Sequence, residues 1–257
     1  MVAATRLSPT LYRYIPLDYL VILAVGLTAG TISGVVGFGS SIMLMPVLVV
    51  VFGPLEAVPI MAVAGLMANF SRVLAWWREI DWRVTGAYAA SGVPAAALGA
   101  ATLVALPPHA VEAVLGVFFL AMIPARHWLA GRNFRLRLAH MAVVGALLGY
   151  LTGIVVSTGP INTPFFLAYG LVKGAYIGTE AAASLAVYAA KAAAFRGFGA
   201  LPWPAVVKGL LVGTTLMAGS FLAKRLVLRL DPAQFRWLMD ALMLAAGITM
   251  LWAAWQG

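Results

Sequence analysis

The chain alternates long apolar runs with short polar connections. A helix that crosses a membrane needs about 20 mostly apolar residues. Eight runs reach that length, at 17–36, 56–77, 83–106, 109–130, 138–156, 174–196, 203–224 and 232–255. Two shorter runs, 41–52 and 160–172, each follow a long run after only a few small or polar residues. This pattern predicts, at each short run, a broken or re-entrant helix pair that meets inside the membrane.

The order of long and short runs occurs twice along the chain. Matched residues recur at spacings of 117 to 121 positions: Gly26 with Gly145, Gly30 with Gly149, Gly34 with Gly153, Pro46 with Pro164, Gly53 with Gly170, Arg72 with Lys191 and Trp82 with Trp203. The recurrence predicts two homologous halves, 1–130 and 131–257, which together form one transmembrane domain. Chance recurrence in a chain rich in Gly and Ala is the alternative.

Each half contains a broken or re-entrant helix pair and three further spans, which is an odd number of segments. Two such halves lie in opposite orientations in the membrane. The predicted fold class is therefore an all-α polytopic membrane protein built as an inverted repeat, an architecture found in many secondary transporters.

Composition supports a membrane protein. Hydrophobic residues make up 63% of the chain and charged residues 10%, whereas about a quarter of a soluble domain is charged. Cysteine is absent, which excludes disulfides and thiolate metal sites. The three histidines show no ligand spacing, so we expect neither a metal nor a cofactor.

The formal charge of +9 comes largely from the connections between apolar runs. Three connections hold most of the basic residues: Arg78 and Arg83; Arg126, Arg132, Arg135 and Arg137; and Lys224, Arg225, Arg229 and Arg236. They form no single stripe of the kind that binds nucleic acid. By the positive-inside rule they mark the cytoplasmic side, which predicts that both termini are extracytoplasmic.

The two breaks carry short polar side chains where a membrane protein is normally apolar. The candidate substrate-binding residues at the breaks are Gly39, Ser40, Ser41, Ser157, Thr158, Gly159, Asn162 and Thr163. If the short helices begin near Ser40 and Pro160, their free N–H groups and positive dipole ends suit an anion. Glycines in such runs can instead serve close helix packing, which we favour for Gly26, Gly30, Gly145 and Gly149.

Ionisable residues inside the apolar runs are the second signal for a site. Arg72 and Lys191 occupy matched positions, and a charge at that depth usually faces a cavity or a partner. Asn69 shares a helix face with Arg72, and Glu180, Ser184 and Tyr188 share one with Lys191. We therefore add Asn69, Arg72, Tyr188 and Lys191 to the substrate-binding set. Glu180 either neutralises Lys191 or carries a coupling proton, and snorkelling of the two basic side chains to the interface is the alternative.

One stretch resembles a known family. The segment Gly30-Thr-Ile-Ser-Gly-Val-Val-Gly-Phe-Gly-Ser-Ser-Ile-Met-Leu-Met-Pro46, followed by Arg78-Glu-Ile-Asp-Trp82, is similar to the first-half signature of the sulfite exporter TauE/SafE family. The resemblance implies a carrier of the bacterial inner membrane that exports sulfite or organosulfur anions such as sulfoacetate.

The residues and the resemblance together predict a secondary transporter that exports a small anion by alternating access. Its expected partners are the anion, the lipid bilayer and a coupling ion such as the proton; a homo-oligomer is left open. A small-anion channel shares every feature above, and a non-transporting scaffold is a further alternative. A membrane enzyme is disfavoured, because the sequence shows no metal-binding histidine pair and no nucleophile motif.

Overall fold

The computed structural model describes residues 15–36, 39–131, 135–155, 158–225 and 232–256. Within them the chain forms ten α-helices, one short 3-10 helix and no strand. These are α1 (Ile15–Val36), α2 (Ser40–Phe52), α3 (Pro54–Trp76), η2 (Trp77–Glu79), α4 (Trp82–Val104), α5 (Pro108–Ala130), α6 (Leu138–Ile154), α7 (Gly159–Tyr169), α8 (Lys173–Gly197), α9 (Trp203–Arg225) and α10 (Pro232–Gln256). Each predicted run corresponds to one helix, so the all-helical prediction is confirmed.

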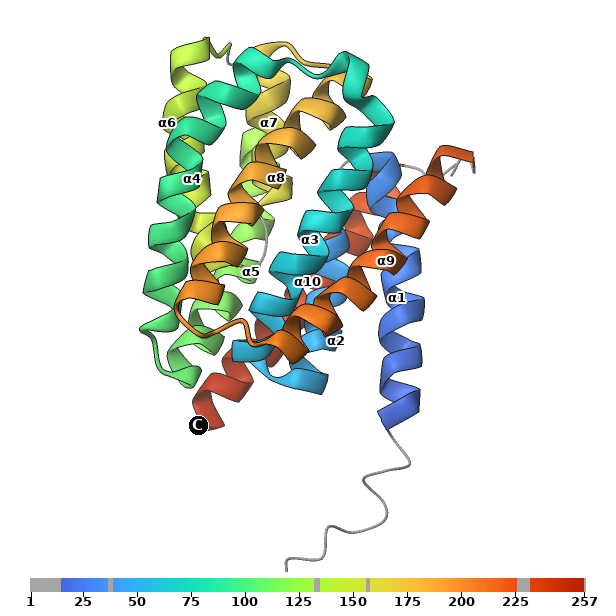
Figure 1. The fold of residues 1–257 in the computed structure, drawn as a ribbon, viewed down its shortest axis with the longest axis vertical. Coiled ribbons are helices and arrows are strands. Elements are labelled where there is room, and N and C mark those ends of the chain that lie inside the picture. Colours follow the sequence, from blue (N-terminus) through green and yellow to red (C-terminus); the bar gives the residue numbers. More distant parts are fainter. Residues whose placement is uncertain (1–14, 37–38, 132–134, 156–157, 226–231, 257) are drawn as a thin grey trace, which may run out of the picture.

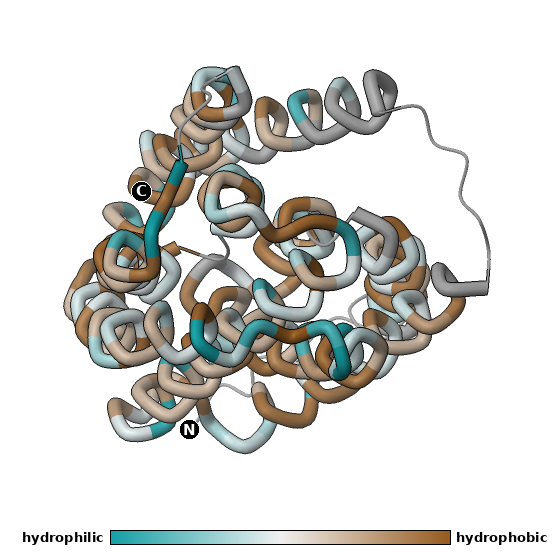
Figure 2. The backbone as a smooth tube through the Cα atoms, turned by 90° about the horizontal axis from the view of Figure 1, so that it is seen from above, coloured by the Kyte–Doolittle hydropathy of each residue, from teal (hydrophilic) through white to brown (hydrophobic). Residues whose placement is uncertain are grey.

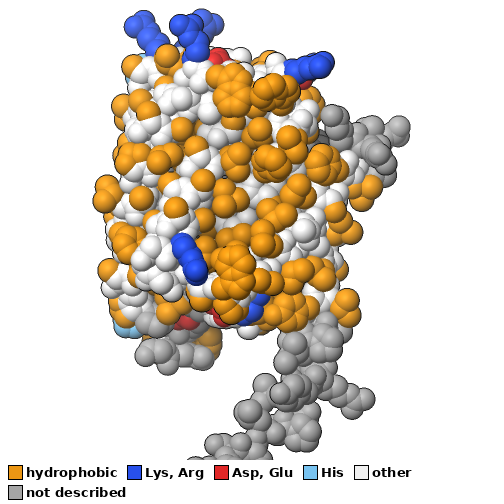
Figure 3. Space-filling model, in the orientation of Figure 1, with side chains coloured by type: hydrophobic (Ala, Val, Ile, Leu, Met, Phe, Trp, Pro, Cys, Tyr) orange, Lys and Arg blue, Asp and Glu red, His pale blue; other side chains and the backbone are white. Residues whose placement is uncertain are grey.

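Among the described residues, four helices are long and apolar enough to cross a membrane. They cover Leu55–Glu79, Trp82–Val104, His109–Leu129 and Trp203–Leu222. Shorter apolar helices lie at Tyr19–Gly34, Ser40–Phe52, Leu138–Ile154 and Met243–Trp252. Apolar side chains are spread over the whole face seen in Figure 3. Large apolar side chains such as Leu98, Leu147 and Trp203 are about two-thirds exposed. Such a surface is suited to lipid rather than to water.

Glycines bring two helix pairs into close contact. On α1, a Cβ added at Gly30 would lie 2.5 Å from the Leu216 carbonyl oxygen of α9. On α6, a Cβ at Gly149 would lie 2.5 Å from the Gly92 carbonyl oxygen of α4. Gly26 and Gly145 also leave no room, since a Cβ at either would meet a neighbouring oxygen at 2.2 Å. The packing role predicted for these four glycines is confirmed.

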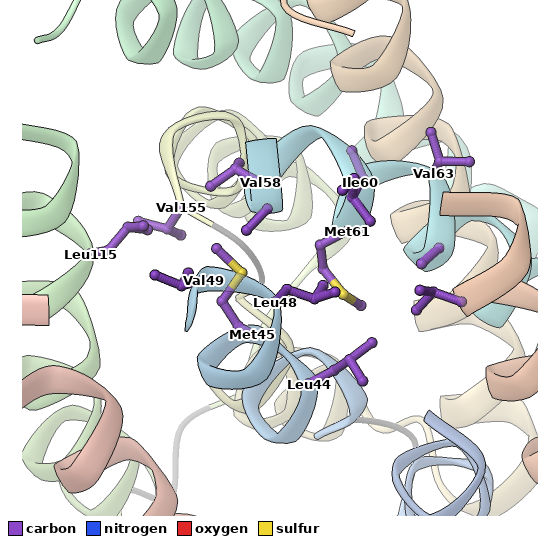
Figure 4. Close-up of a cluster of buried hydrophobic side chains, with 14 of the residues drawn as sticks. Leu44, Met45, Leu48, Val49, Val58, Ile60, Met61, Val63, Leu115 and Val155 are labelled. Atoms are coloured by element: carbon purple, nitrogen blue, oxygen red, sulfur yellow. The ribbon is translucent and has the colours of Figure 1, made fainter. Parts of the chain in front are cut away.

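The two short helices lie inside the bundle. Leu44, Met45 and Leu48 of α2 are completely buried, and they lie beside side chains of α3 and α5 (Figure 4). Around them, α3 packs against α8 and α9, α8 packs against α4, and α5 packs against α10. In α7, Phe166 is also completely buried. Both short helices therefore pack against protein on their inner faces, while Val50 of α2 and Leu167 of α7 are exposed at the surface. Packing against protein is what backbone interrupted at membrane depth requires.

Successive helices run in alternating directions between the two ends of the bundle (Figure 1). The connection through η2 lies at one end, and the α8–α9 connection and the C-terminus lie at the other (Figure 1). Hydrophilic stretches of the tube gather in the connections (Figure 2). The η2 end carries exposed basic residues, several of which are seen in Figure 3: Arg78, Arg83, Arg135, Arg137 and Lys173. At the opposite end Arg196 is exposed and Lys208 is partly exposed, so exposed basic residues are more numerous at the η2 end but are not confined to it.

Candidate functional site

Both short helices begin in the interior of the protein. The chain leaves α1 at Val36 and begins α2 at Ser40, immediately after Gly39. It leaves α6 at Ile154 and begins α7 at Gly159. Gly39 has a φ of 107°, in the left-handed region that a residue with a Cβ rarely adopts, so the turn into α2 favours glycine. The first turns of α2 and α7 leave backbone N–H groups without helical partners.

These two helix starts open onto one cavity, called the central cavity below. It is lined by Gly39, Ser40, Ser41, Gly65, Ala68, Asn69, Arg72, Thr158, Gly159, Asn162, Glu180, Ser184 and Tyr188. Its volume, for the centres of water-sized molecules, is about 20 Å³, which is room for one or two waters. The cavity is therefore narrow and mostly polar, and both helix N-termini lie at its wall.

An ion pair between α3 and α8 lies at the central cavity. The Arg72 Nη1 atom donates to the Glu180 Oε2 atom at 3.2 Å, and the two side chains are 10% and 4% exposed. The second terminal nitrogen of Arg72 donates to the Asn69 side-chain oxygen. The Nε atom of Arg72 is buried and has no hydrogen-bond partner. Arg72 therefore keeps at least this donor uncommitted, and a buried donor of that kind is rare and costly.

Glu180 is held on its other oxygen by neutral donors. The Ser184 hydroxyl donates to the Oε1 atom at 2.7 Å, and the Asn162 amide donates to it at 3.4 Å. Asn162 in turn accepts from the Tyr88 hydroxyl at 2.9 Å. The two carboxylate oxygens are thus distinct, because Oε1 accepts from neutral groups while Oε2 faces the guanidinium of Arg72.

The hydroxyl groups at the two helix starts differ in what they can still donate. The Thr152 hydroxyl donates to the Leu148 carbonyl at 2.6 Å, so the Thr158 hydroxyl must be the donor in its 2.6 Å bond to Thr152. Thr163 donates to the Gly159 carbonyl and accepts from Tyr176. By contrast, no hydrogen bond joins the Ser40 or Ser41 hydroxyl to another described side chain or carbonyl. Among the described hydroxyls of the two helix starts, the available donors therefore belong to α2.

Lys191 lies behind the cavity wall. Its side chain is completely buried, and its ammonium donates to the carbonyl oxygens of Thr152 at 2.6 Å and Val155 at 2.5 Å. These carbonyls belong to the C-terminal end of α6, where a cation also offsets the negative end of the helix dipole. The ammonium also approaches the Phe195 ring, 5.6 Å from its centroid. Neither Lys191 nor Arg72 snorkels, since both are buried inside the protein.

The structure brings most of the predicted residues together. Ten of them line the central cavity: Gly39, Ser40, Ser41, Asn69, Arg72, Thr158, Gly159, Asn162, Glu180 and Tyr188. Thr163 and Lys191 are not among the lining residues, and Ser157 lies outside the described residues. Glu180 pairs with Arg72 rather than with Lys191.

Sequence reasoning missed Tyr88, which orients Asn162 from α4, and left Ser184 outside the binding set. Helical spacing does indicate Ser184, because this residue lies one turn after Glu180 on the same helix face. The partnership of Tyr88 with Asn162 spans 74 residues, and no local pattern indicates it.

A helical protein with an apolar outer face and a polar cavity between interrupted helices belongs to the class of multi-pass membrane transporters. The family model described as "Sulfite exporter TauE/SafE" matches residues 22–250, and the chain belongs to that family. No curated protein and no solved structure matches the chain.

Proposed function

We propose that this protein is a secondary transporter that exports a small anion, sulfite or an organosulfonate such as sulfoacetate, across a bacterial inner membrane. The observation that carries the proposal is the meeting of two helix N-termini and the buried Arg72 at one cavity. Membership of a sulfite exporter family supports the same class of substrate.

The donors at the central cavity suit an oxyanion. Each helix N-terminus contributes about 0.3–1 kcal/mol toward a nearby negative charge, and more where the site is buried. A hydrogen bond from a charged group such as Arg72 contributes about 1.5–3 kcal/mol. The free hydroxyls of Ser40 and Ser41 add neutral donors on the α2 side. A small anion with several oxygens can use all of these groups at once.

The size of the cavity favours transport by rearrangement of the protein. The cavity has room for only one or two waters, so lining groups must separate before a larger anion such as sulfoacetate enters. We propose that the two halves, 1–130 and 131–257, form an inverted repeat that alternates access to the cavity. Three observations support this proposal. The contact of α1 with α9 has its counterpart in the contact of α6 with α4, and the contact of α5 with α7 has its counterpart in the contact of α10 with α2. In addition, α1 and α6 run in opposite directions (Figure 1).

The charge difference between the two ends of the bundle supports an orientation. The η2 end carries the exposed Arg78, Arg83, Arg135, Arg137 and Lys173, and basic connections remain on the cytoplasmic side. We propose that this end is cytoplasmic and that both termini are extracytoplasmic. A C-terminal reporter that is active only in the cytoplasm should stay silent in intact cells.

The test of the function is anion flux into proteoliposomes that hold the purified protein. The panel is sulfite, sulfate, sulfoacetate, taurine and simple carboxylates, each measured with and without a pH gradient. The proposal predicts saturable uptake of sulfite or a sulfonate that speeds up when the same anion is present on the far side. A channel gives flux without this acceleration, and the absence of flux for every anion would refute transport altogether.

A further inference from the structure

The Arg72–Glu180 ion pair occupies the place where an anion would bind. Arg72 is 8% exposed and Glu180 is 3% exposed, and both line the central cavity. A transported anion needs the same guanidinium that the carboxylate of Glu180 now holds at 3.2 Å. Glu180 and the substrate therefore compete for Arg72.

Few ionisable groups lie near Glu180, and those of η2, which also packs against α8, are the exposed Arg78 and Glu79. The element α3 supplies Arg72 and α4 supplies Tyr88, while α8 itself supplies Tyr176, Tyr188 and Lys191. From α7 the nearest polar group is Asn162, and the ionisable residues of α6, His140 and Tyr150, are exposed at its outer side. The ammonium of Lys191 is committed to the end of α6, so Arg72 is the cation in contact with Glu180.

With Arg72 and Glu180 both charged, the pair carries no net charge. Entry of a monovalent anion would place two negative charges around one guanidinium in a buried site. Removing charges from water is costly unless each is paired and hydrogen-bonded, so this arrangement is strongly unfavourable. Neutralising one of the two negative groups removes this electrostatic cost. The carboxylate of Glu180 is the group that can accept a proton in the cavity.

We infer that Glu180 takes up one proton whenever a monovalent anion binds to Arg72, which makes this protein an anion–proton symporter. The inference rests on the proposed function and specifies how that site is coupled. A proton from water adds to the Oε2 atom, because Oε1 already accepts hydrogen bonds from Ser184 and Asn162. The Nη1 donor of Arg72 then passes from Oε2 to an oxygen of the anion, and the new O–H of Glu180 can donate to the same anion. One monovalent anion and one proton move together without net charge.

The test uses methanesulfonate, which keeps a single negative charge across the working pH range. Wild-type proteoliposomes that hold a pH-sensitive dye are given an inward methanesulfonate gradient. The inference predicts internal acidification with about one proton per anion and no dependence of the flux on an imposed membrane potential. Methanesulfonate uptake that generates a membrane potential without acidification would overturn it, as would transport of sulfite but not of methanesulfonate. Loss of all anion flux would instead defeat the proposed function.

The Glu180→Gln variant separates coupling from a structural role. The amide cannot take up a proton, so anion uptake should become electrogenic, and methanesulfonate binding at alkaline pH should strengthen at least tenfold. The matched control is Glu112→Gln on α5, which should keep the wild-type ratio of protons to anions. If the Glu180→Gln protein moves methanesulfonate with one proton per anion, Glu180 is not the coupling group. If the variant does not fold, the wild-type ratio decides by itself.

Discussion

Arg72 of α3 and Lys191 of α8, 119 residues apart and predicted from the sequence to be equivalent positions of a repeat, meet opposite surroundings. Arg72 faces side chains at the central cavity and pairs with Glu180 of the other half. Lys191 faces backbone and holds the carbonyls of Thr152 and Val155 at the end of α6. A side-chain acceptor can be exchanged for a substrate oxygen, whereas backbone carbonyls at a helix end stay in place. We therefore expect Arg72, rather than Lys191, to bind the substrate.

The starts of α2 and α7 also differ in whether their hydroxyl groups are available to a substrate. On the α2 side, the hydroxyls of Ser40 and Ser41 have no hydrogen bond to another described side chain or carbonyl. On the α7 side, the hydroxyls of Thr158 and Thr163 are committed to neighbouring acceptors. We therefore expect the first half to supply most ligands to the anion. The second half supplies the fixed framework and the counter-charge of Glu180.

The largest effect on transport is expected from Arg72→Gln. Loss of the guanidinium removes the main charge that stabilises an anion in the cavity, so anion uptake should fall at least about 100-fold. This fall corresponds to the loss of the ion pairing together with a charge-assisted hydrogen bond of roughly 1.5–3 kcal/mol. Anion uptake into proteoliposomes, normalised to folded protein, measures this. Arg78→Gln at the exposed η2 end should keep wild-type uptake.

Arg72→Gln alone leaves the Glu180 carboxylate buried without its cation, which costs about 3–5 kcal/mol of stability. The double variant Arg72→Gln with Glu180→Gln removes both charges and should restore folding but not transport. Wild-type uptake in the folded double variant would mean that the cavity does not bind the anion through Arg72.

Lys191→Met should affect stability more than transport. The two carbonyls at the end of α6 would lose their donor, at a cost of about 1–3 kcal/mol each. We expect a lower thermal unfolding midpoint in detergent, while uptake per folded molecule stays within a few-fold of wild type. Lys208→Met is the control, because its ion pair with Glu56 is partly exposed and should contribute less than about 1 kcal/mol. Complete loss of uptake in a stable Lys191→Met protein would place Lys191 in the substrate path.

The smallest effect is expected at the hydroxyls. Ser41→Ala removes a donor that is available to the anion, so the KM should rise about 3- to 10-fold, in line with a hydrogen bond of about 0.5–1.5 kcal/mol. Thr158→Val removes a hydroxyl that is already donated to Thr152 and should leave the KM unchanged. Equal changes in KM for the two variants would contradict the division of roles between α2 and α7.

Much of the fold could be predicted from the sequence because the signals are local. Runs of apolar residues fix where each helix begins and ends, and Gly30 and Gly149 mark close helix contacts through their spacing. The two breaks were also visible, since Gly39 and Pro160 interrupt helices at places where polar side chains appear. These breaks and the ionisable residues inside the apolar runs identified ten residues that the structure places on one cavity.

The partners of the buried charges could not be predicted in the same way. Glu180 lies on the same helix face as Lys191, and that local relation favours a pair between them. In the structure Glu180 reaches Arg72 across 108 positions of sequence, while the end of α6 takes the ammonium of Lys191. Helix periodicity identifies which residues share a face, but it does not indicate which other helix that face meets.

The central claim is that an oxyanion binds between the starts of α2 and α7 on the guanidinium of Arg72. The most direct measurement is an experimental structure of the protein in lipid with selenite, which has the shape and charge of sulfite and an atom that scatters X-rays anomalously. We expect selenium density in the central cavity, with selenite oxygens about 2.7–3.2 Å from Arg72 nitrogens and from N–H groups of both helix starts. Selenium bound at the exposed Arg135 and Arg137 instead, with none in the cavity, would contradict it.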